Sequence, residues 1–113
     1  MDCIPYRQDK KIVTVTTTIK IKGEKVPEGY LLEVTHMSIS DLDTADKLLE
    51  LGYETLSEDE KILLANKGTQ NYQCKLNGHV WIEGGEAPFG RVTSPTNSDD
   101  VAFSCHGKLY KKV

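Results

Sequence analysis

The sequence predicts an all-β, mainly antiparallel fold: a β-sandwich or jelly roll with one short helix. Three observations predict it. Residues 12–22 alternate strictly between two kinds of side chain, further strand-like stretches recur about every ten residues, and glycine, proline and asparagine separate them. At 113 residues, the chain is long enough for one domain and too short for two ordinary ones. We therefore expect an N-terminal arm over residues 1–11 and a single β-sandwich domain over residues 12–113.

The arm, Met1–Lys11, mixes charged residues with Ile4, Pro5 and Tyr6 and has no clear period. We expect it to be disordered or to lie on another surface, although a frayed terminus explains the same composition. It contains no apolar signal core, and no apolar run in the chain approaches the ~20 residues needed to span a bilayer. The sequence therefore predicts neither a cleavable signal peptide nor a membrane-embedded protein.

Residues 12–22 predict the first strand. One parity carries mainly β-branched aliphatic residues, and the other carries threonine and lysine: Val13, Val15, Thr17, Ile19 and Ile21 against Thr14, Thr16, Thr18, Lys20 and Lys22. A helix is disfavoured because the consecutive residues Thr16–Thr18 would lose side-chain freedom in it. Tyr30–Ser40 predicts a second strand with apolar residues on both parities, which is typical of a central strand covered on both faces or in contact with a neighbouring chain.

The middle of the chain is mixed. Lys47–Thr55 fits the start of a helix, but the alternation of Leu49, Leu51 and Tyr53 favours a strand. Residues 57–60 (SEDE) match a capping box, the leucine-rich residues 62–64 supply an apolar face, and Gly68 supplies a stop. We therefore place the short helix here.

Residues 72–83 predict a β-hairpin, because Asn77-Gly78 suits a two-residue type I′ turn. The register of such a turn puts Trp81 on the same face as Cys74, which carries the larger apolar groups and should enter the core. Val80 and Ile82 then remain on a half-polar face and are candidates for subunit contact. After Gly84-Gly85, we expect a short strand over residues 89–93 and a last long strand that starts at Val101.

Charge and cysteine content exclude several classes of protein. A net charge of −3 argues against a general nucleic-acid-binding surface, and the basic run Lys108–Lys112 is more typical of a solvated edge strand. An odd number of cysteines does not make a disulfide framework. We interpret Cys3, Cys74 and Cys105 as reduced, mostly buried thiols of a protein folded in a cytosol.

We expect no metal, no cofactor and no catalytic residue. Zinc motifs need close Cys or His pairs, whereas His36, His79 and His106 are isolated, which also departs from the His-x-His pattern of cupin enzymes. No nucleophile elbow or phosphate-binding glycine loop occurs. Loop aspartates offer the oxygen ligands that calcium prefers, but they lack the EF-hand order, and turn capping explains them better. These aspartates are Asp41, Asp43, Asp46, Asp99 and Asp100.

Three stretches resemble the turns and strands of small jelly-roll accessory proteins of tailed bacteriophages. They are Val26–Val34 (VPEGYLLEV), Val80–Gly90 (VWIEGGEAPFG) and Ser98–Ser104 (SDDVAFS), and the resemblance spans residues 19–105. It implies a non-enzymatic structural virion protein, a capsid decoration or stabilising subunit. Such a protein would be a homo-oligomer, with a trimer favoured, on the major capsid protein or another virion protein.

The resemblance also implies a location in the virion after assembly in the host cytoplasm. We expect the contacts to involve Ile4 and Tyr6 of the arm and Val80 and Ile82 of the hairpin. The alternative is a receptor- or carbohydrate-binding β-sandwich module of a fibre, collar or baseplate. A third hypothesis is a small enzyme or metal-binding protein on a cupin-like barrel.

Overall fold

A computed structural model describes residues 3–44, 46–66 and 73–112 of the chain. Within them lie eight β-strands and no helix, so none is available to cross a membrane. The strands are β1 (Cys3–Val13), β2 (Ile19–Lys22), β3 (Tyr30–Asp41), β4 (Leu48–Glu54), β5 (Glu60–Asn66), β6 (Gln73–Glu83), β7 (Ala87–Thr93) and β8 (Asp100–Lys111).

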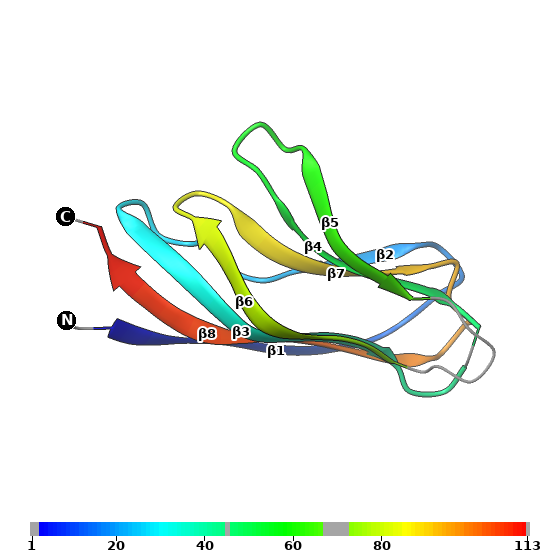
Figure 1. Ribbon diagram of the computed structural model, residues 1–113. Helices are drawn as coiled ribbons and strands as arrows, with labels where there is room; N and C mark the ends of the chain where they lie inside the picture. Colours follow the sequence, from blue (N-terminus) through cyan, green and yellow to red (C-terminus); the bar gives the residue numbers. More distant parts are fainter. Residues whose placement is uncertain (1–2, 45, 67–72, 113) are drawn as a thin grey trace.

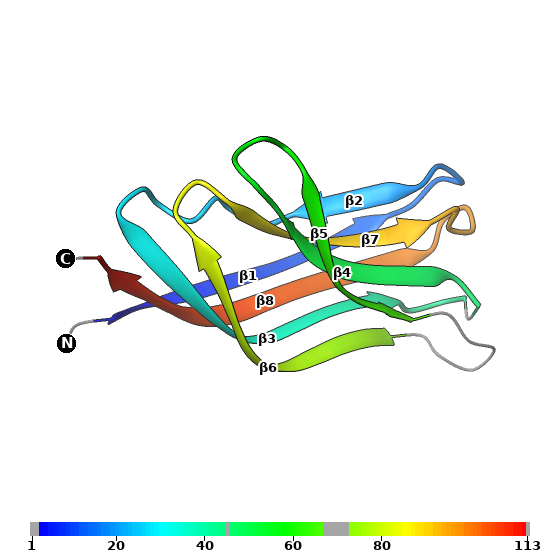
Figure 2. The same ribbon diagram turned by 45° about the horizontal axis from the view of Figure 1, so that its top comes forward.

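The strands form two four-stranded sheets that face one another (Figures 1 and 2). One sheet has the order β1-β8-β3-β6 and the other β2-β7-β4-β5, and all neighbouring strands are antiparallel. Consecutive strands alternate between the sheets, except that β4 and β5 form a hairpin within one. The prediction of an antiparallel all-β sandwich is therefore confirmed.

The core lies between the two sheets. On β8, Val101, Phe103 and Cys105 are fully buried, as their shared parity predicts. Leu32 and Ile39 enter from β3, and the second sheet contributes Leu49 and Leu51 from β4 and Val92 from β7. Full burial of a side chain of this size contributes about 1.5–3 kcal/mol to folding, so this layer is the main source of stability.

The N-terminal third differs from expectation in two ways. Cys3–Val13 pairs with β8 along its whole length, so residues 3–11 form most of the edge strand β1 instead of a separate arm. The single strand expected over residues 12–22 is wrong, because the chain changes sheets within it, between β1 and β2. Thr14 holds this corner: its backbone N–H donates to Asp99 O at 2.9 Å and its hydroxyl donates to Thr96 O at 2.8 Å.

The helix expected after Ser57 is also wrong. Thr55, not Ser57, closes a turn here: its hydroxyl oxygen accepts the Asp59 N–H, and its carbonyl accepts the Glu58 N–H. Glu58 has φ of 64°, which interrupts a helix but suits a tight turn. The apolar residues that follow form β5, which pairs with β4. The strand favoured for Lys47–Thr55 is confirmed as β4, and Gly68 lies outside the described residues.

The hairpin expected at Asn77-Gly78 does not form. β6 runs through both residues and pairs with β3 on either side of them, with a register shift between Val34 and His36. Gly78 has φ of 140° and lies at this irregularity, so the dipeptide forms part of a β-bulge instead of a turn.

The missing turn also reverses the prediction for Trp81. Without a turn, the parity of β6 continues, so Val80 and Ile82 join Cys74 on the inner face and Trp81 faces outward. Ile82 is fully buried, whereas 49% of Trp81 is exposed.

β3 is a central strand of its sheet, as its apolar content predicts, with β8 on one side and β6 on the other. The bulge at Thr35 is shared with both neighbours. Opposite it, Gly107 of β8 lies so close to β3 that a Cβ atom would clash with the Glu33 carbonyl oxygen. Only glycine fits there, because the obstacle is backbone.

Candidate interaction surface

The two outer faces of the sandwich differ in chemistry. The outer face of β2-β7-β4-β5 carries a network of ion pairs. Lys20 Nζ lies 2.6 Å from carboxylate oxygens of both Glu54 and Glu60, and Arg91 bonds to Glu60 at 2.6 Å and to Glu50 at 3.0 Å. Hydrogen bonds from Lys20 and Lys22 lower the pKa of Glu54 to about 2.

This network also covers the apolar surface beneath it. The buried ring of Phe89 has Lys20 Nζ 4.5 Å from its centroid and the Arg91 guanidinium at 5.6 Å. Cations over an aromatic face are attracted by its quadrupole, and their aliphatic stems cover the ring. This face neutralises its own charge and leaves its largest aromatic residue covered, so it offers little to a partner.

The outer face of β1-β8-β3-β6 carries an aromatic pair. Trp81 on β6 and Tyr110 on β8 have ring centroids 6.1 Å apart, across β3. Tyr110 also donates its hydroxyl proton to Glu33 Oε1 at 3.2 Å. Leu31, the β3 partner of Tyr110, completes the group with the stems of Lys111 and Lys112. These five residues line an apolar surface hollow of about 320 Å³; we call them the Trp81 patch.

All three histidines lie on the same face. His79 Nδ1 is 2.8 Å from Glu33 Oε2, and His106 Nε2 is 2.9 Å from Asp9 Oδ1. The rings of His36 and His106 are 5.4 Å apart. Within the described residues, these histidines do not join a group of three metal-ligating side chains. His79 is linked to the Trp81 patch through Glu33, which also accepts the Tyr110 hydroxyl proton.

The four interface residues expected from sequence lie in different environments. Ile4 is 49% exposed on the edge strand β1, and Val80 is partly buried against the core. Tyr6 and Ile82 are buried between the sheets, and the Tyr6 hydroxyl donates to Glu24 O at 2.7 Å. Tyr6 and Ile82 therefore contact the core of their own chain.

Sequence reasoning missed the Trp81 patch. The register of a hairpin put Trp81 in the core, and Tyr110 was considered only as part of a basic strand. The signal that finds the patch is a single uninterrupted strand over residues 73–83, because its parity then places Trp81 outside. Apart from Trp81, the large apolar residues exposed in the described part of the chain belong to connections, to the ends of β1 or to β5: Ile4, Val13, Val15, Leu42, Leu56 and Ile62.

No protein-family model matches the chain, and no curated protein matches it. Among solved structures, it is similar to the Drosophila NLP core, from a study of pentamer formation and histone binding. The TM-score is 0.51 at 11% identity, with 94% of this chain and 99% of that chain covered.

A protein of Bacillus endospore appendages, described as disulfide-linked pili, gives a TM-score of 0.52 at 6% identity, with 98% of this chain and 89% of that chain covered. A chain of infectious bursal disease virus Gx strain gives 0.45 at 10% identity, with 96% and 32% covered. At these identities the first two likenesses show a shared fold and nothing finer.

Proposed function

We propose that the chain is a non-enzymatic structural subunit of a virus particle that assembles through the Trp81 patch. The observation that carries the proposal is the contrast between the two outer faces. One is covered by balanced ion pairs, and the other exposes an aromatic pair over an apolar hollow. Half-exposed tryptophan and tyrosine are enriched where protein surfaces meet.

The sheet order supports a jelly roll as the finer description of the sandwich. The first and last strands are neighbours in one sheet, and strands β2 and β7 are neighbours in the other. Eight strands arranged in two sheets of this kind are found in viral capsid domains, lectins and cupins. A jelly roll alone does not define a function, so the proposal depends on the surface.

In this proposal the chain is a homo-oligomer, with a trimer favoured, and it decorates or stabilises a capsid after assembly in the host cytoplasm. Ile4 is exposed on β1, which is one edge strand of the sheet that carries the Trp81 patch; β6 is the other edge strand. Within the described part of the chain, β1 pairs with β8 alone, which leaves its other edge available to a neighbouring chain.

The test is mass spectrometry of purified particles of the virus that encodes the chain, followed by rebinding. Wild-type protein is expected in the particles at a fixed ratio to the major capsid protein. The variant Trp81→Thr is expected to fold but not to sediment with particles stripped of the protein, whereas Ile62→Thr, on the other sheet, still does. Absence of the chain from particles contradicts the proposal.

A second function is favoured by one specific feature. A half-exposed tryptophan beside a hollow of about 320 Å³, with Glu33, His79 and Tyr110 as hydrogen-bonding groups nearby, also suits a sugar ring. A glycan array distinguishes this receptor-binding function from assembly. Specific glycan binding that Trp81→Thr abolishes would favour it, and an array without signal would leave assembly as the role of the patch.

A further inference from the structure

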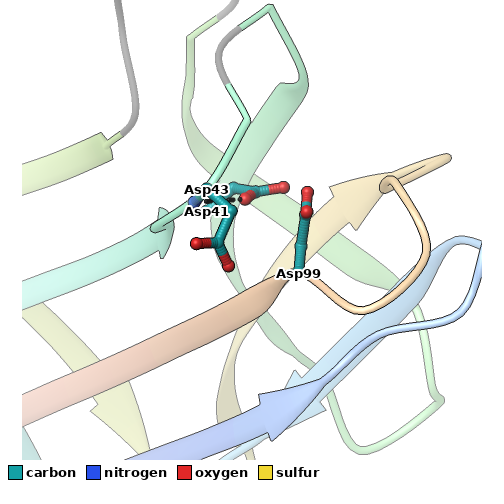
Figure 3. A group of neighbouring side chains, drawn as sticks. All are labelled: Asp41, Asp43 and Asp99. Carbon is teal, nitrogen blue, oxygen red and sulfur yellow. Dashed lines mark hydrogen bonds between the residues drawn. The ribbon is translucent and has the colours of Figure 1, made fainter.

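Three aspartates meet at the end of the sandwich where the β3–β4 and β7–β8 connections lie together (Figure 3). Asp41 is the last residue of β3, Asp43 follows it, and Asp99 directly precedes β8. One carboxylate oxygen from each lies within 4.8 Å of the other two. Two oxygens that bind one calcium ion at about 2.4 Å can be at most about 4.8 Å apart, so this spacing fits a shared ion.

Two of these carboxylates are buried, and each has one oxygen without a hydrogen-bond partner among the described residues. Asp41 is fully buried and Asp99 is 4% exposed. Among the described residues, neither Asp41 Oδ2 nor Asp99 Oδ2 has a hydrogen-bond partner, and the two carboxylates face each other (Figure 3). Buried carboxylates are ordinarily paired or bound to a metal, because an unpaired charge is costly to remove from water.

Backbone N–H groups orient the Asp41 and Asp43 carboxylates but do not bond to Asp41 Oδ2 or Asp99 Oδ2. Asp41 Oδ1 accepts the N–H groups of Asp43 and Thr44 at 3.1 and 3.0 Å, and the buried Oδ2 is left facing Asp99 (Figure 3). Asp43 Oδ2 accepts the Asp100 N–H at 2.7 Å and thereby joins the two connections. No lysine or arginine within the described part of the chain forms an ion pair with any of the three aspartates.

We propose that Asp41, Asp43 and Asp99 bind one calcium ion, which joins the β3–β4 and β7–β8 connections. The ligands are all hard oxygen donors, without the Cys or His that zinc prefers. Calcium fits better than magnesium, which requires oxygens at about 2.0–2.1 Å in near-ideal octahedral geometry. The EF-hand order is absent because the third ligand comes from a distant connection, which only the fold brings near.

The other occupant of such a pair is a proton. Burial, and after it the neighbouring Asp99, raises the pKa of Asp41, so a proton shared by the two carboxyls would also relieve the repulsion. The two occupants predict opposite responses to added calcium.

The test uses the whole chain, treated with EDTA, desalted and titrated with CaCl2 at pH 7.5 by calorimetry and by thermal unfolding. We expect one calcium ion per chain. At about 100 times the dissociation constant, free calcium should raise the Tm by about 10 °C. MgCl2 should give a smaller rise; an equal rise would contradict the assignment to calcium.

Variants then locate the site. Asp99→Asn and Asp41→Asn should lose the rise in Tm, and Asp43→Asn, at an exposed position that tolerates substitution, should weaken calcium binding at least about tenfold. Asp46→Asn is the matched control, because it removes the same charge from the same connection but lies outside the group.

A wild-type Tm that does not respond to calcium, together with a higher Tm of Asp41→Asn or Asp99→Asn in EDTA, would assign the pair to a proton and overturn the proposal. A response lost in Asp46→Asn and retained in Asp99→Asn would overturn it as well.

Discussion

Replacing Trp81 by threonine should separate assembly from folding. Threonine has a high strand propensity, and position 81 lies on the outer face, so the sandwich should still form. Tryptophan presents an area on the order of 250 Å², and 49% of Trp81 remains exposed in the monomer. About 120 Å² is therefore available for burial by a partner. At about 25 cal/mol per Å², its burial contributes about 3 kcal/mol.

That free energy corresponds to a weakening of self-association by about 100-fold for Trp81→Thr. Sedimentation velocity over a series of protein concentrations measures the dissociation constant, and circular dichroism verifies the fold. Ile62→Thr is the matched control, because Ile62 is 43% exposed on β5 of the other sheet. An unchanged dissociation constant for Trp81→Thr, or an equal loss for Ile62→Thr, would refute the assignment of the patch.

Three further predictions concern the fold. Gly107→Ala should lower the free energy of unfolding, measured by urea denaturation, by about 3 kcal/mol, because the added Cβ clashes with the Glu33 carbonyl oxygen. Ser104→Ala, on the outer face of β8, should lower it much less. The pKa of Glu54 falls from 4.5 to about 2 on folding, so its stabilisation is present above pH 4.5 and is lost as the pH falls toward 2. Glu54→Gln should therefore cost about 1 kcal/mol at pH 7 and almost nothing near pH 2, and an equal cost at both would contradict the network. Burial raises the pKa of Cys74 to about 11 and of Cys105 to about 12, whereas Cys3 is exposed. Ellman's reagent at pH 8 should therefore titrate one thiol per native chain and three in guanidinium. Three reactive thiols in the native chain would contradict this core.

The sandwich was predictable because burial imposes a two-residue period that survives in the sequence. Val101, Phe103 and Cys105 alternate with small or polar residues, and all three are buried. Tyr30–Ser40 has apolar residues on both parities, and β3 is central. These features depend on local pattern, which the sequence contains.

The predictions that were wrong concern elements whose structure depends on pairing with strands distant in the chain. Asn77-Gly78 has the local preference of a hairpin turn, but pairing with β3 on both sides keeps β6 continuous. Residues 57–60 have the pattern of a helix cap, but pairing with β4 extends the residues that follow into a strand. One misassigned turn inverted the faces of Val80, Trp81 and Ile82. The exposed position of Trp81 in the candidate surface was missed for that reason.

The three aspartates show the same limit. Asp41, Asp43 and Asp99 all belong to the loop aspartates that the sequence offers as oxygen ligands, but they lie in two separate loops and match no known calcium motif. Asp99 completes the group only because β3 and β8 are neighbours in the sheet. No local reading of the sequence supplies that pairing.

Trp81 is the only tryptophan of the chain, so intrinsic fluorescence reports directly on the proposed contact surface. Acrylamide quenching can be measured while the protein is concentrated from the monomer to the oligomer. If the Trp81 patch is the contact surface, acrylamide quenching of Trp81 decreases and its emission shifts to the blue as the oligomer forms. Oligomers in which Trp81 is quenched as strongly as in the monomer would contradict it.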